Sequence, residues 1–237
     1  KKNAFDLTKT KKEVILDLWN NELSSSSNYG RFTLALSGTT SGIDTFLVTL
    51  QSGSTGFYEQ SIGTATVTTS SLSSWHHYAL SFVSASNSIT SRLYVDGDLN
   101  ESKSLGSVGL NAIGGRVNGY IGALQTSPSG SSAAAYAGKL SASLDDFRYW
   151  KTRRTSKDIH SNWYRHVGGG TNTDDANTKL GVYYKFNEGI VGNSTDATVL
   201  DYSGRLVNGS WTGYSSGARS TNSAFVESGL LTSEEKD

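Results

Sequence analysis

Two adjacent carboxylates, Asp145 and Asp146, are the first candidates for chemistry in this 237-residue chain, and they precede the aromatic run FRYW (147–150). A strand directs neighbouring side chains to opposite faces, so we expect these two carboxylates to point apart. Two carboxylates that cleave one glycosidic bond must approach it from one surface, roughly 5 to 10 Å apart. The pattern therefore argues against a catalytic pair. It leaves a scaffold role or a calcium site, because calcium prefers hard oxygen donors.

Other catalytic patterns are missing from the sequence. Cysteine is absent, which excludes a thiolate metal site and a cysteine nucleophile. His76 and His77 alternate in a predicted strand, and His160 and His166 are too far apart for the i, i+4 zinc arrangement on a helix. No Gly-x-Ser-x-Gly elbow is present. We therefore expect a protein that is not an enzyme.

Charge and hydropathy narrow the class of partner. Lys and Arg together number 21, as do Asp and Glu, so the chain lacks the basic excess typical of nucleic-acid binding. No apolar run approaches the roughly 18 residues of a membrane span. We therefore predict no nucleic-acid partner and no membrane span. The opening KKNAFDLTKTKKEV carries neither Met nor a signal peptide, so we expect a part of a longer protein.

Short alternating runs separated by Gly and Ser turns dominate the chain, and each is typical of a strand. Asp96-Gly97 is a two-residue hairpin signal between two of them. The pattern predicts an all-β fold, an antiparallel two-sheet jelly-roll sandwich. The runs lie at residues 13–19, 31–38, 44–53, 64–69, 73–83, 89–102, 116–124 and 139–150.

One short helix is predicted on the rim of the sandwich. Thr155 can cap it, and Asp158 three residues later completes a capping box. Ile159, Trp163 and Val167 would form one apolar stripe before the glycines at 168–170 end the helix.

The same patterns divide the chain into a sandwich body (1–167), a Gly/Thr/Asn-rich loop (168–178), closing strands (179–226) and a tail (227–237). About fifty residues after the loop are too few for an independent core without cysteine or metal. We therefore expect residues 179–226 to complete the first sandwich, the alternative being the start of a second domain.

Three motifs, in order, resemble the laminin-G-like, concanavalin A-like jelly rolls. They are the strand WHHYALSFV, the hairpin LYVDGDL, and the late strand LDDFRYW before a short helix, and together they cover roughly residues 73–165. LGVYYKFNEG and VLDYSGRLVNGSWTG resemble a further signature of the family, which here comes last. This trailing order is similar to that in large structural proteins of bacteriophages.

The resemblance implies a non-catalytic module of a larger extracellular or phage virion protein, with a role in glycan or cell-surface binding, or adhesion. The alternative is a purely structural interaction or decoration domain of the virion, bound to other virion proteins. A glycoside hydrolase is least favoured, because related laminarinase-type glucanases carry Glu-x-Asp-x-x-Glu and none of the eight Glu lies in such a pattern. Homo-oligomers would form through the parent protein, on an extracellular or virion surface.

The resemblance also implies site residues. A structural calcium ion would be held by Asp145 or Asp146 with Asp201 and Asn208. Sugar-binding sandwiches place aromatic rings against pyranose faces, and the candidates are Tyr29, Tyr58, Tyr120, Tyr136, Trp211 and Tyr214.

Overall fold

The computed structural model describes residues 1–2, 12–39, 42–64, 66–105, 109–124, 140–168, 178–186 and 198–210. The chain divides into two compact units, Lys1–Ala142 and Ser143–Asp237. No helix within these ranges is long and apolar enough to cross a lipid bilayer.

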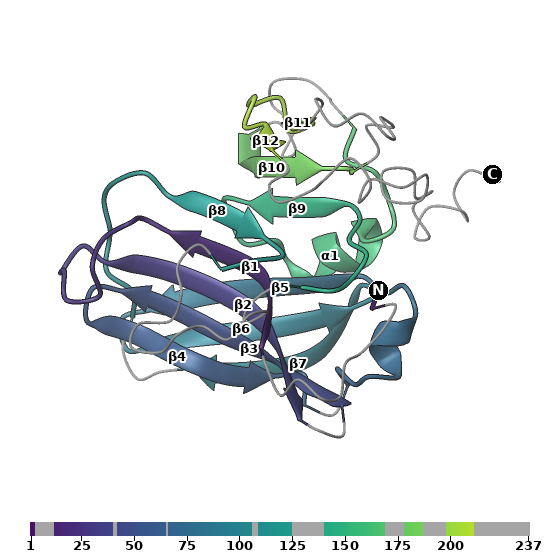
Figure 1. Cartoon of the computed structure of the whole chain (residues 1–237), viewed down its shortest axis with the longest axis horizontal. Helices are drawn as coiled ribbons and strands as arrows, with labels where there is room; N and C mark the ends of the chain where they lie inside the picture. The colour runs from purple at the N-terminus through teal and green to yellow at the C-terminus, as the bar shows by residue number, and fades with distance from the viewer. Residues whose placement is uncertain are drawn as a thin grey trace. The chain divides into compact units, whose positions relative to one another are not determined.

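Two antiparallel sheets form the first unit (Figure 1). The five-stranded sheet has the order β4-β3-β2-β1-β8, and the three-stranded sheet has the order β5-β6-β7. Their strands confirm the prediction of an all-β, antiparallel fold. The bounds are β1 (Glu13–Trp19), β2 (Gly30–Thr39), β3 (Gly42–Ser52), β4 (Thr55–Ile62), β5 (Tyr78–Ala85), β6 (Ser88–Val95), β7 (Asp98–Leu105) and β8 (Asn118–Ile121).

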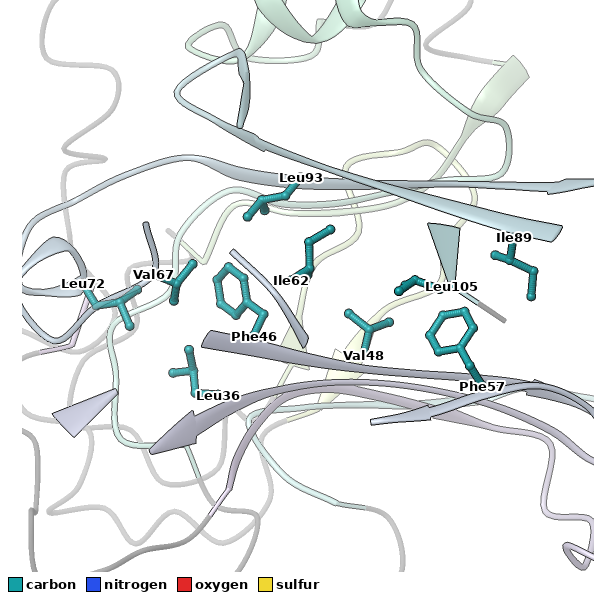
Figure 2. Close-up of a cluster of buried hydrophobic side chains, with 10 residues drawn as sticks. All are labelled: Leu36, Phe46, Val48, Phe57, Ile62, Val67, Leu72, Ile89, Leu93 and Leu105. Atoms are coloured by element: carbon teal, nitrogen blue, oxygen red, sulfur yellow. The ribbon is translucent and has the colours of Figure 1, made fainter. Parts of the chain in front are cut away.

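The hydrophobic core of the first unit lies between these two sheets, as Figure 2 shows. Strand alternation supplies much of it, because alternate residues of β2, β3 and β5 are apolar and point inward. Burying one large apolar side chain contributes about 1.5–3 kcal/mol, so this cluster holds the two sheets together. Its members are Leu36, Phe46, Val48, Phe57, Ile62, Val67, Leu72, Ile89, Leu93 and Leu105.

The predicted hairpin at Asp96-Gly97 joins β6 to β7. Both residues have positive φ, 49° and 86°, as a type I′ turn requires. The Asp96 carboxylate also accepts a hydrogen bond of 2.8 Å from the backbone N of His77 and lies 2.6 Å from His76 Nδ1. The hairpin prediction is confirmed, and the aspartate adds a link to the segment before β5 (Tyr78–Ala85).

Side chains of β7 join the two sheets along one edge. Lys103 Nζ donates to the carbonyl oxygen of Ser61 at 2.8 Å, and Glu101 Oε2 accepts from the backbone N of Gly63 at 2.6 Å. Unpaired backbone groups at a sheet edge invite pairing with other chains. These two contacts therefore give backbone groups at the end of the edge strand β4 hydrogen-bond partners from the same unit.

The second unit contains β9 (Phe147–Trp150) paired antiparallel with β10 (Leu180–Tyr184), and β11 (Thr198–Val199) paired with β12 (Gly209–Ser210). β9 precedes the predicted loop 168–178 and β10 follows it. The boundary between compact units nevertheless lies at Ala142/Ser143 and not at that loop. Completion of the first sandwich by residues 179–226 stays a prediction.

Helix α1 (Ser156–Asn162) begins with the predicted capping box. Thr155 Oγ1 accepts from Asp158 N at 3.1 Å, and Asp158 Oδ2 accepts from Thr155 N at 3.0 Å. The predicted extent to Val167 is wrong, because the helix ends at Asn162. Arg148 Nη1 donates a hydrogen bond to the backbone carbonyl oxygen of Asn162, the last residue of the helix. This tertiary contact cannot be predicted from the helical pattern.

Candidate functional site on the five-stranded sheet

The face of the five-stranded sheet that points away from the core carries polar and aromatic side chains. Leu34 packs on the core, so its neighbour Thr33 points the other way, and Asp17 is the cross-strand partner of Thr33. Arg31 lies two residues from Thr33 and therefore shares this face. We call it the outer face and define it by Asp17, Trp19, Tyr29, Arg31, Thr33, Thr49, Gln51, Tyr58 and Tyr120.

A buried ion pair lies at the centre of the outer face. Arg31 Nε donates to Asp17 Oδ1 and Arg31 Nη2 donates to Asp17 Oδ2, each at 2.9 Å, which is the bidentate geometry of a strong pair. Thr33 Oγ1 donates to Asp17 Oδ1 at 2.9 Å. The Asp17 side chain is 0% exposed and that of Arg31 is 17% exposed. Apolar residues often replace such a pair without loss of stability, so stability alone does not account for it.

The guanidinium of Arg31 is held on several sides. It lies 5.6 Å from the centre of the Trp19 ring, within the range of a cation–π contact. Burial by itself would lower the pKa of Arg31, but the hydrogen bonds and charge of Asp17, with a smaller effect of Tyr29, raise it. Arg31 therefore stays charged and fixed in orientation at any physiological pH.

Three of the predicted sugar-binding aromatics gather around this pair. Tyr58 is 63% exposed and interacts electrostatically with Arg31 and Tyr29. Tyr120 is 40% exposed, and its strand partner is Asp17. The prediction of Tyr29 as a sugar-binding ring is corrected, because this side chain is buried and only 7% exposed. Tyr29 therefore supports Arg31, whereas Tyr58 and Tyr120 offer ring surface. The candidates Tyr136, Trp211 and Tyr214 lie outside the described residues.

A β-bulge presents Tyr58 at the edge of the sheet. The pairing of β3 with β4 shifts between Val48 and Leu50, so Tyr58 and Glu59 together oppose Thr49. Glu59 has a φ of 46°, and its backbone N donates to Thr49 Oγ1 at 3.0 Å. Burial, followed by the hydrogen bond and charge of Glu59, raises the pKa of Tyr58. The phenol is therefore neutral and able to donate a hydrogen bond at neutral pH.

Asp17, Arg31 and Thr33 are site residues that the sequence pattern alone did not predict. A signal was present, because Asp17 interrupts the apolar strand EVILDLW and Arg31 and Thr33 alternate with apolar residues in RFTLALSG. Such polar positions predict which side chains share a face within one strand. They do not predict which strands lie side by side in the sheet.

The two adjacent carboxylates do not lie in a strand. β9 begins at Phe147, and Asp146 has a φ of 54°, in the left-handed region. The strand alternation assumed for Asp145 and Asp146 is therefore wrong. Asp146 forms an ion pair with Arg148, and their side chains are 5% and 9% exposed. This pair is also close to Tyr183, whose pKa is raised by burial and then by interaction with Asp146.

Asp201 organises the loop after β11. Its Oδ1 accepts from the backbone N of Tyr183 (3.0 Å) and Ser203 (2.9 Å), and its Oδ2 accepts from Ser203 Oγ (2.8 Å) and Val207 N (3.0 Å). Asn208 Oδ1 accepts from Asp201 N at 2.9 Å. Burial alone would raise the pKa of Asp201, but these hydrogen bonds lower it. All four lone-pair directions of this carboxylate are thus used, one by Tyr183 of β10 (Leu180–Tyr184) and three by its own loop.

The predicted calcium ligands therefore differ in whether their carboxylate oxygens have lone pairs available for an ion. Asp146 and Asp201 contact opposite ends of Tyr183, the side chain and the backbone N respectively. Calcium ligands bind at 2.3–2.6 Å, so an ion would have to displace the loop donors to reach Asp201. Asp146 Oδ1, in contrast, is buried and accepts no hydrogen bond within the described part of the chain. Among those same residues, no three His, Asp or Glu side chains gather closely enough to hold a metal. Calcium binding stays a prediction.

Similarity to known proteins indicates the family of this chain. No curated protein matches the chain. A crystal structure from Bacteroides ovatus, described as a "putative carbohydrate binding protein", aligns with a TM-score of 0.42 and 17% identity. The alignment covers 85% of this chain and 52% of that one, so this chain spans about half of its length. The model of the concanavalin A-like lectin/glucanases superfamily matches residues 9–160, which include the whole outer face. This protein therefore belongs to the concanavalin A-like lectin/glucanase superfamily.

Proposed function

We propose that this chain is a non-catalytic carbohydrate-binding module and that its outer face holds the sugar. The observation that carries the proposal is the buried Asp17–Arg31 pair between two exposed tyrosines, Tyr58 and Tyr120. Membership of a superfamily of lectins and glucanases supports the same ligand class. Polar groups flanked by aromatic rings can bind both the hydroxyl groups and the apolar C–H faces of sugars.

The chemistry of such binding follows from the side chains. The C–H face of a pyranose is apolar and packs on an aromatic ring, whereas its hydroxyls require donors and acceptors nearby. Tyr58 and Tyr120 supply the rings, and Thr33 and Gln51 supply small polar groups. Arg31, already oriented by Asp17, requires little ordering on binding, which favours affinity.

Catalysis is not part of the proposal. Glycoside hydrolysis requires two carboxyl groups on either side of the bond, one of them able to deliver a proton. Asp17 is engaged by Arg31 and Thr33, and Glu59 is engaged by Lys12 at 2.5 Å. Both carboxylates therefore act as acceptors for the protein's own donors, which supports binding without turnover.

The proposal extends to a structural calcium ion next to Asp146, supported by the unused acceptor Asp146 Oδ1. Addition of calcium to the chelator-treated protein should raise its melting temperature, and Asp146→Asn should abolish that rise. An unchanged melting temperature up to millimolar calcium would contradict this part. The setting on an extracellular or virion surface, and the alternative role as a virion decoration domain, are supported by the order of the trailing motifs alone.

The test of the main proposal is a glycan array followed by titration calorimetry on the best ligand. We expect Tyr58→Ala and Tyr120→Ala each to weaken binding about tenfold, as loss of a central aromatic contact commonly does. Tyr149→Ala is the matched control, because Tyr149 is similarly exposed (43%) but lies on β9 in the other compact unit. Binding to no glycan, or equal loss in all three variants, would contradict the proposal.

A further inference from the structure

We infer that the ligand of the outer face is an uncharged, linear oligosaccharide of about four or more sugar units that lies across the strands. This inference rests on the proposed function and adds the length, direction and charge of the ligand. Two observations carry it independently: the register of the strands, and the pairing of the charges.

The register places one row of side chains across all five strands. Tyr120 on β8 opposes Asp17 on β1, Asp17 opposes Thr33 on β2, and Thr33 opposes Thr49 on β3. Tyr58 lies in the bulge of β4 that faces Thr49. Directly opposed residues share a face, so the row runs from one edge of the sheet to the other.

The ends of this row differ from its middle. Tyr58 and Tyr120 are exposed, whereas Asp17 and Thr49 between them are 0% and 6% exposed. Four spacings separate the outermost strands, and at about 4.8 Å each they set the two tyrosines roughly 19 Å apart along the sheet. One sugar ring has about the width of one spacing, so a ligand that contacts both tyrosines contains about four sugars.

The charges along the row are paired. Arg31 directs two of its donors to Asp17, and Lys12 contacts Glu59 beside Tyr58. Each pair sums to zero charge. A uronic acid or sulfated sugar would need a cation free to form a charge-assisted bond, and Arg31 could supply one only by leaving Asp17 buried without its partner. The face therefore favours hydroxyl groups over anionic groups.

The experiment uses neutral and acidic oligosaccharides of one to six units on an array, with calorimetry on the best neutral series. We expect affinity to rise at least tenfold from one unit to about four units and then to level off. Acidic oligosaccharides of equal length should bind at least tenfold more weakly. Tyr58→Ala and Tyr120→Ala should each abolish most of this gain with length, and Tyr149→Ala should leave it intact.

The outcomes separate the inference from the proposed function. A single sugar that binds as tightly as a tetramer overturns the extended site but leaves glycan binding in place. Tighter binding of acidic oligosaccharides overturns the inferred charge of the ligand, again with glycan binding preserved. Absence of binding to every member of the array overturns both. Because both tyrosines are exposed, unchanged melting temperatures are expected to show that the variants are folded.

Discussion

Replacement of the Asp17–Arg31 pair provides the sharpest test of how the outer face is built. Asp17→Leu removes a carboxylate that is 0% exposed and leaves Arg31, 17% exposed, without its counter-charge. Loss of one partner of a buried pair costs about 3–5 kcal/mol. Thr33 Oγ1 also loses an acceptor, which adds about 1 kcal/mol. We therefore expect Asp17→Leu to lower the free energy of unfolding by about 4–6 kcal/mol.

Arg31→Met should cost a similar amount, about 3–5 kcal/mol, because it leaves the Asp17 carboxylate buried and alone. The double variant places two apolar side chains side by side and should lose only about 1–2 kcal/mol, most of it from Thr33. The coupling energy of the double-mutant cycle is therefore about 5 kcal/mol or more.

Urea denaturation followed by tryptophan fluorescence measures each free energy of unfolding. The control cycle uses Lys12 and Glu59, whose side chains are 48% and 28% exposed and whose coupling should stay below about 1 kcal/mol. A coupling below about 1 kcal/mol for Asp17 and Arg31 as well would refute the buried ion pair. The folded double variant also separates stability from function: it should remain folded and lose glycan binding.

Three further predictions concern local structure. Thr155→Ala removes the cap of α1 and should lower the free energy of unfolding by about 1 kcal/mol in urea denaturation, with Asp158→Asn costing less because an amide still accepts. The pKa of Asp201 is lowered in the folded state, so its stabilisation is complete above its unfolded pKa and lost as the pH falls through its folded pKa. The protection factor of Tyr183 N against hydrogen exchange, which corrects for the intrinsic exchange rate, should therefore fall on acidification below about pH 4, and an unchanged protection factor would contradict this. Gly63→Ala should cost about 1–3 kcal/mol, because Gly63 has a φ of 83° and an added Cβ would lie 2.8 Å from a side-chain carbon of Leu93. A melting temperature equal to that of the wild type would refute this steric reasoning.

Local hydrogen bonding explains which predictions from sequence succeeded. The hairpin at Asp96-Gly97 and the capping box of Thr155 and Asp158 each depend on a few neighbouring residues. Their chemistry is complete within the segment, so the pattern alone predicts them. The strand conformation expected at Asp146 failed for the opposite reason. Asp146 has a left-handed φ and forms a buried ion pair with Arg148. The local sequence pattern does not predict which residues become buried in the folded unit.

The sequence by itself determined most of the strands, the Asp96-Gly97 turn, the cap of the helix and the family, because alternation, turn chemistry and motif order act over short distances. It did not predict β4 (Thr55–Ile62), and the run at 64–69 forms no strand among its described residues. Only the tertiary structure decided that Asp17, Arg31, Tyr58 and Tyr120 share one face. They come from four strands, and a bulge in β4 sets which residues of that strand oppose β3. A shift of one residue in strand pairing moves a side chain to the other side of the sheet. The site therefore depends on register, which arises when the sheets pack around their common core.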